Sequence, residues 1–390
     1  SLSGLLGDYT SAILFYKMKI GLICPYSINK HGGVLEVVLA LQEGLSQRGH
    51  EVKIITPMPR GGKDIEHPDA IFIGNSTDFR SPSHTTGQVS SITDNDKVDA
   101  ILDKEKFDVL HFHEPWVPFL SRQLLQRSKA INIGTFHSKT PETVVSRTYL
   151  KVVTPYLKSV MKYLNVLTAV SDSGAEYAAG LTDLPITIIP NGIDLKKYSY
   201  KGPKKAPNSQ TILYVGRLER RKGAKYLLRA FALYSKDNPD TKLLIAGDGP
   251  EREKLEMFAE DLNIKNISFL GFITEELKLQ LLKEADLFCS PAIFGESFGI
   301  VLLEAMATGT VIVAGNNSGY SDLMQGIGAI SIVNPEDTQE FARRIQLLLH
   351  ETKIRQIWQD WALGYVKQFS NPIIIDQYEA LYKDSLNQYG

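Results

Sequence analysis

Two glutamates in the stretch GESFGIVLLEAMATG, residues 295–309, have the type and spacing to do chemistry. Glu304 lies inside an apolar run, where an unpaired buried charge is costly, so it needs either a neighbouring cation or a ligand that brings hydroxyl groups. A carboxylate accepts both hydrogen bonds of a vicinal diol. This suits Glu304 to a ribose 2′,3′-diol and Glu296 to adjacent hydroxyls of a hexose. A buried structural acceptor is the alternative for each.

A helix that begins near Gly299 would leave its first backbone N–H groups without partners inside the helix. These groups form the positive end of the helix dipole, so a phosphate would be stabilised beside them. The residues that would present them are Ser297, Phe298, Gly299 and Ile300.

Basic residues follow a strand-like run in YVGRLERRKGAKYLL, residues 214–228. Arg217 lies just past the predicted strand and Lys222 at the next turn, a placement that suits a diphosphate whose charge grows as it leaves. We expect Arg220 and Arg221 to be solvated surface charges.

Two glycines, Gly32 and Gly33, precede the first predicted helix in the loop PYSINKHGGV. Glycines at a helix N-terminus let a phosphate approach the backbone N–H groups, although a tight turn without a ligand is equally open. The pattern is not the G-x-G-x-x-G of a dinucleotide fold, which disfavours a dehydrogenase.

Two histidines alternate in the predicted strand of FDVLHFHEPWVP, residues 107–118, and so share one face. His113 lies nearer the strand end and could contact a reacting sugar, with His111 as its structural partner and core packing as the alternative. Zinc is not expected, because His137 in TFHSKT is the only nearby candidate for a further ligand.

Short β-branched runs alternate with longer helical patterns from Met18 onward, which is typical of parallel α/β layers. Two doubly wound domains facing one another would place the carboxyl ends of both sheets at a shared cleft, where ligands bind. Strands are expected at KIGLIC, VKIITP, FDVLHFH, INIGTFH, NVLTAVS and ITIIP, and then at TILYVG, TKLLIAG, ISFLG, DLFCS, TVIVAG and AISIV.

A stretch rich in lysine and proline, SYKGPKKAPNSQ, has no periodicity and is interpreted as a linker between the domains. The expected organisation is an extension at 1–17, a first domain at 18–198, the linker at 199–210, a second domain at 211–368 and a helix at 369–390 that crosses back.

Composition excludes several classes of protein. A net charge of −1, from 43 basic and 44 acidic side chains, argues against a general nucleic-acid binder. The only cysteines, Cys24 and Cys289, exclude a disulfide framework or a cysteine metal site and favour a reducing cytoplasm. No run approaches 18 consecutive apolar residues, so no membrane span is expected.

The segments GGV, HFHEP, IPNGID, VGRLERRKG and GESFGIVLLEAMATG together resemble the retaining nucleotide-sugar glycosyltransferases of family 4. The resemblance extends from Met18 to the C-terminal helix and implies the GT-B fold, two Rossmann-like domains facing a central cleft. Within the family, IGLICPYS, TFHS and AVSD make the chain most similar to bacterial enzymes that transfer mannose from GDP-mannose to phosphatidylinositol.

This resemblance implies a role for each candidate residue, with the acceptor on the first domain and the donor on the second. Catalytic roles fall to His113 at the reacting centre, Arg217 and Lys222 on the diphosphate, and Glu296 on the sugar. Donor contacts fall to Gly32, Gly33, Ile273, Lys278, Ser297, Phe298, Gly299, Ile300 and Glu304. Acceptor contacts fall to Tyr26, Thr135 and His137.

Two departures from those mannosyltransferases concern spacing and charge. The arginine-to-lysine spacing around RKG is one residue shorter, and SSITDNDKVDAILDKEK is mixed and rather acidic where a basic membrane-facing region is expected. A basic stripe on a helix interrupted by Pro155 could substitute at an anionic membrane, a solvated face being the alternative. The stripe consists of Arg147, Lys151, Lys158 and Lys162.

No carboxylate pair stands at glycosidase-like positions, so we expect front-face attack through an oxocarbenium-like transition state rather than a double displacement. The leaving phosphate would act as the base, no cofactor is required, and a divalent metal is at most stimulatory. Rivals are a UDP-sugar-dependent transferase on a lipid or glycan, an epimerase or phosphorylase, and a non-catalytic sugar-nucleotide sensor. A cytoplasmic location is expected, and peripheral contact with the inner face of the cell membrane is left open.

Overall fold

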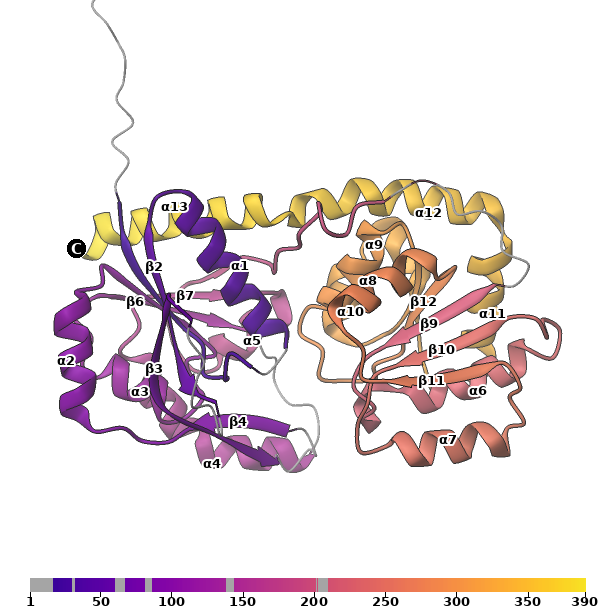
Figure 1. The fold of residues 1–390 in the computed structure, drawn as a ribbon, viewed down its shortest axis with the longest axis horizontal. Coiled ribbons are helices and arrows are strands. Elements are labelled where there is room, and N and C mark those ends of the chain that lie inside the picture. The colour runs from indigo at the N-terminus through magenta and orange to yellow at the C-terminus, as the bar shows by residue number, and fades with distance from the viewer. Residues whose placement is uncertain are drawn as a thin grey trace, which may run out of the picture.

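The computed structural model describes residues 17–29, 32–59, 67–80, 86–137, 144–200, 202 and 210–390. Figure 1 shows two halves side by side, each a β-sheet with helices packed around it. Residues 1–16 and most of the expected linker lie outside the described residues. The α/β class with two mainly parallel sheets is confirmed.

The first sheet has the strand order β4-β3-β2-β1-β5-β6-β7-β8 and is parallel except for the edge pair of β3 and β4. Its inner strands are buried along their length, which explains their β-branched and apolar composition. The strands are β1 (Lys19–Ile23), β2 (Glu51–Met58), β3 (Ala70–Arg80), β4 (Thr86–Ser90), β5 (Val109–His113), β6 (Ile131–Phe136), β7 (Val166–Ala169) and β8 (Ile186–Ile188).

One face of this sheet packs against α1 (Gly33–Gln47) and α13 (Asn371–Tyr389) in a single apolar cluster. Helix α1 buries Val37, Val38 and Leu41 there and is followed by Gly49 at φ 91°, a conformation that favours glycine. The other face packs against α2 (Asn95–Glu105), α3 (Leu120–Leu125), α4 (Val144–Met161) and α5 (Asp172–Ala179).

The second sheet is fully parallel, with the strand order β11-β10-β9-β12-β13-β14. Its strands are β9 (Thr211–Val215), β10 (Lys242–Ala246), β11 (Ile267–Gly271), β12 (Leu287–Ser290), β13 (Val311–Gly315) and β14 (Ile332–Val333). The helices around it are α6 (Ala224–Tyr234), α7 (Arg252–Asp261), α8 (Glu275–Glu284), α9 (Ile300–Ala307), α10 (Ser318–Leu323), α11 (Thr338–His350) and α12 (Thr352–Tyr365).

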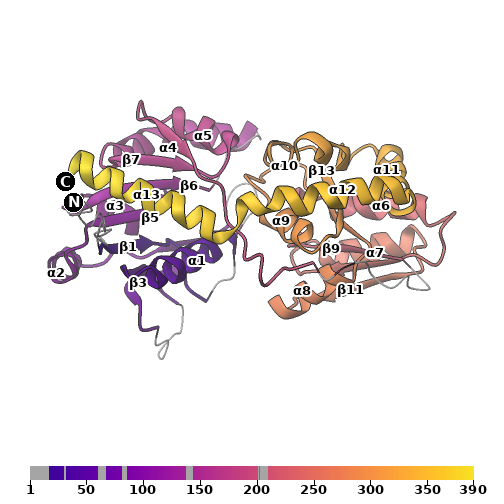
Figure 2. The ribbon, with the colours of Figure 1, turned by 90° about the horizontal axis from the view of Figure 1, so that it is seen from above.

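Helices α12 and α13 follow one another across the molecule, as Figure 2 shows from above, and α13 packs on the first sheet. The returning chain meets the outgoing one where Ile193 forms a parallel bridge with Ser370. The two connections between the halves therefore run side by side at this point.

Three local expectations were wrong or incomplete. Sequence patterns did not predict strands β3 and β4. The predicted strand AISIV, residues 329–333, is reduced to the two residues of β14, because Gly326–Ser331 forms a 3₁₀ helix that packs against Trp361. Pro155 does not interrupt α4. Packing of Leu157 and Val160 against the sheet offsets its missing hydrogen bond.

Candidate functional site

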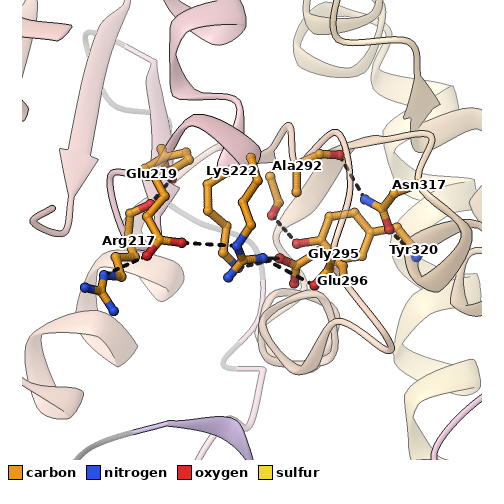
Figure 3. A network of polar contacts seen from close by, with 11 residues as sticks. Arg217, Glu219, Lys222, Ala292, Gly295, Glu296, Asn317 and Tyr320 are labelled. Carbon is orange, nitrogen blue, oxygen red and sulfur yellow. Dashed lines mark hydrogen bonds and ion pairs between the residues drawn. The ribbon is translucent and has the colours of Figure 1, made fainter. Parts of the chain in front are cut away.

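Lys222 and Arg221 hold the carboxylate of Glu296 in the loops that follow β9 and β12. Figure 3 shows Lys222 beside Glu296. Lys222 Nζ lies 2.6 Å and Arg221 Nη1 2.8 Å from Glu296 Oε1, and the side chain of Glu296 is only 12% exposed. Burial raises the pKa of Glu296, but the two cations outweigh burial and leave this pKa below its usual value. Glu296 is therefore an ionised, oriented carboxylate.

Arg221 corrects the expectation of a solvated charge, whereas Arg220 is exposed as expected. The Arg221 side chain is 21% exposed and donates to Glu219 Oε2 at 3.1 Å as well as to Glu296. Burial would lower the pKa of Arg221, yet the two carboxylates raise it. The basic run thus places one guanidinium between two acidic side chains, where desolvation is compensated.

Arg217 lies on the other side of Glu219, with its Nε 3.0 Å from Glu219 Oε1 (Figure 3). Its side chain is 42% exposed, and the buried Glu219 joins it to Arg221. Arg217, Glu219 and Arg221 therefore form one chain of alternating charges that ends on Glu296.

Glu304 in α9 is 3% exposed and binds two donors through one of its oxygens. Lys278 Nζ lies 2.7 Å and the Tyr198 hydroxyl 2.8 Å from Oε1, whereas Oε2 is buried without a hydrogen-bond partner among the described residues. Burial raises the pKa of Glu304, Lys278 opposes the shift, and the charge of Glu36 in α1 adds to it. A cation thus accompanies the carboxylate, and one acceptor atom remains for a ligand.

Helix α9 begins immediately after Gly299, as predicted. Gly299 has φ 97° and lies so close to Tyr320 that a Cβ would be 2.8 Å from the ring, so only glycine fits without displacement. Phe298 is buried against Phe369, and Ser297 is half-buried. The turn therefore carries Glu296 and the helix N-terminus as one packed unit.

His113 pairs with His137 through Nδ1 and Nε2, 2.8 Å apart, and His113 Nε2 is buried without a partner among the described residues. His111 instead uses both ring nitrogens, at 2.7 Å from Tyr382 and 2.6 Å from Thr135. Burial lowers the pKa of His113 well below its usual value, as it does for His111 and His137. The imidazole of His113 is therefore neutral, and His111 is tied into the core.

Predicted acceptor residues lie around this histidine pair. His137 is held through its backbone N–H, which donates to Glu114 Oε1 at 3.1 Å. Tyr26 is half-buried, and burial followed by the charge of Glu114 raises its pKa. Thr135 is fully buried, with its hydroxyl engaged by His111 and Thr168, so in this structure it is not exposed to a ligand.

The two halves meet where the N-termini of α1 and α9 approach each other. A Cβ on Gly33 would lie 3.3 Å from Ile300 Cδ1, and Ile300 packs against the cores of both halves. Gly32 and Gly33 are exposed at this junction. Ile273, at the start of the loop before α8, packs on the core of the second half.

Neither a metal cluster nor a membrane span is found in the described ranges. No group of three or more His, Cys, Asp or Glu that could hold a metal ion gathers among these residues. No helix in the same part of the chain has the length and apolar character to cross a membrane.

Two facing parallel α/β sheets with polar residues at their carboxyl ends define the GT-B class of glycosyltransferases. Residues 31–197 match the family model described as Glycosyltransferase Family 4, and residues 199–362 match the one described as Glycosyl transferases group 1. The chain is 31% identical over 368 residues to phosphatidyl-myo-inositol mannosyltransferase of Mycolicibacterium smegmatis, covering 91% of this chain and 89% of that protein. The chain belongs to glycosyltransferase family 4, and the expectation of a hexosyltransferase enzyme is confirmed at this level.

Other proteins that are similar to this chain are named as enzymes other than mannosyltransferases. N-acetyl-alpha-D-glucosaminyl L-malate synthase of Bacillus anthracis is 26% identical, over 95% of this chain and 98% of its own. Among solved structures, sucrose-phosphate synthase from Thermosynechococcus elongatus has a TM-score of 0.76 at 22% identity and covers 95% of this chain and 100% of its own. At this identity the structural match supports the fold.

Proposed function

We propose that this enzyme transfers mannose from GDP-mannose, with retention at the anomeric carbon, to a hydroxyl of a lipid acceptor, phosphatidylinositol being the expected one. The observation that carries the proposal is the pair of carboxylates at α9, with Glu296 largely buried in the loop before the helix and Glu304 buried within it. Glu296 is ionised and oriented by Lys222 and Arg221, and Glu304 keeps one buried oxygen without a partner. These carboxylates suit the hexose and the ribose of a nucleotide sugar.

In this proposal the cations and the helix N-terminus stabilise the leaving diphosphate. Lys222 and Arg217 bring positive charge to the loop after β9. The first backbone N–H groups of α9, which begins after Gly299, add the positive end of the helix dipole. Their charge is fixed before the reaction, so it stabilises the charge that develops on the phosphate without reorganisation. The phosphate then takes the proton of the attacking hydroxyl on the same face of the sugar.

His113 would line the reacting centre as a neutral imidazole. Its Nδ1 is engaged with His137, which leaves Nε2 for the sugar or the acceptor. Packing of Ile300 against the cores of both halves supports closure of the site around the donor, which would exclude water.

Peripheral contact with an anionic membrane at the cytoplasmic face belongs to the same proposal. Lys151, Lys158 and Lys162 are exposed on and just after α4, so three of the four basic residues of the stripe face solvent. The side chain of Arg147 lies outside the described residues. Cationic side chains near a membrane surface are attracted to anionic lipid.

A UDP-sugar donor is the second candidate, because the Bacillus anthracis relative that matches 95% of this chain is named for N-acetylglucosaminyl transfer. The test is turnover of the full chain with GDP-mannose, UDP-glucose or UDP-N-acetylglucosamine in the presence of phosphatidylinositol vesicles. We expect product with GDP-mannose alone. Turnover with UDP sugars alone would show that the donor is a UDP sugar and not GDP-mannose. Binding of a nucleotide sugar without any turnover would favour a non-catalytic sugar-nucleotide sensor.

Replacement of the sugar-side carboxylate tests the site itself. Glu296→Ala should lower kcat/KM by about a hundredfold or more, since one fixed electrostatic contact is removed from the reacting centre. Arg220→Ala is the matched control, because Arg220 is exposed in the same basic run. Near-normal turnover by a folded Glu296→Ala enzyme would contradict the assignment.

A further inference from the structure

We propose that Tyr198 is a positioning residue for the donor ribose, because its hydroxyl holds the Glu304 carboxylate with Oε2 available to the diol. Tyr198 thereby becomes a determinant of selectivity for ribose over deoxyribose in the donor nucleotide. The inference rests on the proposed function, in which Glu304 binds the ribose.

Both lone pairs of Glu304 Oε1 are used by protein donors. The Tyr198 hydroxyl donates to this oxygen at 2.8 Å and Lys278 Nζ at 2.7 Å. Oε2 is buried and has no hydrogen-bond partner in the described part of the chain. A ligand hydroxyl that reaches this carboxylate therefore finds its acceptor at Oε2.

Two donors on one oxygen also fix the plane of the carboxylate. The terminal torsion of a glutamate is broad and roughly two-fold, so a carboxylate with a single partner can turn and exchange its oxygens. Lys278 gives a less directional contact, because its ammonium carries three donors that can rotate, and it also pairs with Glu275 at 2.9 Å. The tyrosine hydroxyl is the second, directional donor. Its distance to Glu275 is longer, at 3.4 Å, so its single proton goes to Glu304.

The segment that carries Tyr198 is itself anchored at the crossing point of the two halves. Ile193 donates to Phe369 at 2.8 Å and accepts from Asn371 at 3.0 Å. Asp194 then caps the following turn, its Oδ1 accepting from the backbone N–H groups of Lys196 and Lys197. This turn presents the phenol to α9, which gives a local function to the IPNGID motif.

The tyrosine ring can be kept while the hydroxyl is removed. Tyr198 is 4% exposed and packs in the core cluster of the second half, so Tyr198→Phe preserves volume and apolar contact. Tyr226 offers a matched control, since its hydroxyl donates to Glu336 at 2.9 Å on an exposed surface of the same half. Tyr226→Phe deletes the same atom and the same type of hydrogen bond.

The test compares binding of GDP and 2′,3′-dideoxy-GDP by calorimetry, with the UDP pair run in parallel so that base preference does not decide the result. A site that hydrogen-bonds a hydroxyl rejects the analogue that lacks it, so the wild type should prefer each ribonucleotide. Tyr198→Phe should reduce that preference about tenfold by weakening ribonucleotide binding, the loss expected for one hydrogen bond to a charged group. Tyr226→Phe should keep the wild-type preference.

Steady-state kinetics supply a readout that a general structural role would not move. Tyr198→Phe should raise KM for GDP-mannose and leave kcat near that of the wild type, because uniform binding is lost. Asp194→Ala is a second variant, to be used if Tyr198→Phe does not fold. It removes the side chain that caps the turn before Tyr198, so it should also reduce the preference for the ribonucleotide.

Each result decides a different point. An unchanged ribose preference in folded Tyr198→Phe would overturn the role of Tyr198 and leave the proposed function standing. A wild type that binds the ribo and dideoxy forms equally would overturn the ribose assignment of Glu304 together with this inference. Binding of neither GDP nor UDP would overturn the proposed function itself.

Discussion

At the scale of single residues, the site is organised by which atoms of a side chain are already engaged. Glu304 has one oxygen bound and the other buried without a partner, and His113 has one nitrogen bound and the other buried likewise, both among the described residues. A buried polar atom without a partner is costly, and such atoms occur where a ligand completes the site. Glu296 likewise has one oxygen engaged, because its Oε1 is paired with Arg221 and Lys222.

His113 provides a prediction about pH. Burial lowers its pKa well below the usual value, so it stays neutral between about pH 5.5 and pH 8, where an exposed histidine titrates. His113→Gln should lower turnover about a hundredfold, within the range of lost proton-transfer or polar contacts. The shape of the profile of kcat/KM against pH should not change, because no titration of His113 falls within that window.

The control is His350→Gln. His350 lies in the second half, away from His113, and its imidazole bonds the Tyr234 hydroxyl at 3.0 Å. This variant should keep both the rate and the profile. An inflection near pH 6.5 that is present in the wild type and lost only in His113→Gln would contradict the neutral imidazole.

At the scale of elements, helix α13 joins the second half to the strand that carries the histidines. Tyr378 and Tyr382 are buried against the first sheet, and the Tyr382 hydroxyl bonds His111. On its other side, Glu379 forms ion pairs with Arg48 at the end of α1 and with Lys383. The crossing helix is therefore held by packing on one face and by charge on another.

Acid should weaken this charged contact. Burial raises the pKa of Glu379, but bonds from Lys383, Arg48 and His50 lower it to about 2, from an ordinary 4.5 in the unfolded chain. The contact stabilises the fold fully above about pH 4.5, and the stabilisation is lost as the pH falls toward 2. Glu379→Gln should therefore lower the Tm by a few degrees at neutral pH and by less near pH 3.

Thermal unfolding followed by circular dichroism at the two pH values measures this effect. Asp384→Asn, an exposed change on the same helix, should shift the Tm little and by the same amount at both. Equal losses of Tm for Glu379→Gln at neutral and acid pH would show that its ion pairs do not stabilise the docked helix.

At the scale of the whole molecule, the two halves contact each other through the start of α1 and the start of α9. Gly33 leaves just enough room for Ile300, since a Cβ would lie 3.3 Å from Ile300 Cδ1. Elsewhere, the parallel bridge of Ile193 and Ser370 joins the two chain segments that connect the halves. Small residues at the junction therefore determine how closely the half-sites approach.

Gly33→Val should push the two helix starts apart. A branched side chain at this position overlaps Ile300, and a displacement of about 1 Å at a reacting centre can reduce turnover about a hundredfold. Each half should still fold, because Gly33 is exposed. The measurements are kcat with GDP-mannose and the Tm.

Gly364→Ala is the control for the change from glycine, since no atom lies within 4 Å of a Cβ built there. Gly364 lies in the last turn of α12, where the change should stabilise the protein by at most about 0.5–1 kcal/mol and leave kcat unchanged. Wild-type turnover by Gly33→Val would contradict the close approach of the halves as a requirement for catalysis.

The sequence alone determined the two α/β halves, the crossing helix and the start of α9. Each follows from local patterns: β-branched runs mark buried parallel strands, and Gly49 and Gly299 mark helix ends where positive φ is needed. The candidate residues were found because functional side chains follow the carboxyl ends of such strands. The edge strands β3 and β4 were missed, because half-exposed strands lack that continuous apolar signal.

Only the tertiary structure decided which side chains are partners. Arg221 resembled a solvated charge until the fold placed it between Glu219 and Glu296, and Tyr198 contacts Glu304 across 106 positions of sequence. Local periodicity records which face of an element is buried, whereas ion pairs and hydrogen bonds depend on how separate elements are packed together. The sequence therefore located both carboxylates, and the packing of the connecting segment, α8 and α9 decided which oxygen of Glu304 is engaged by protein donors.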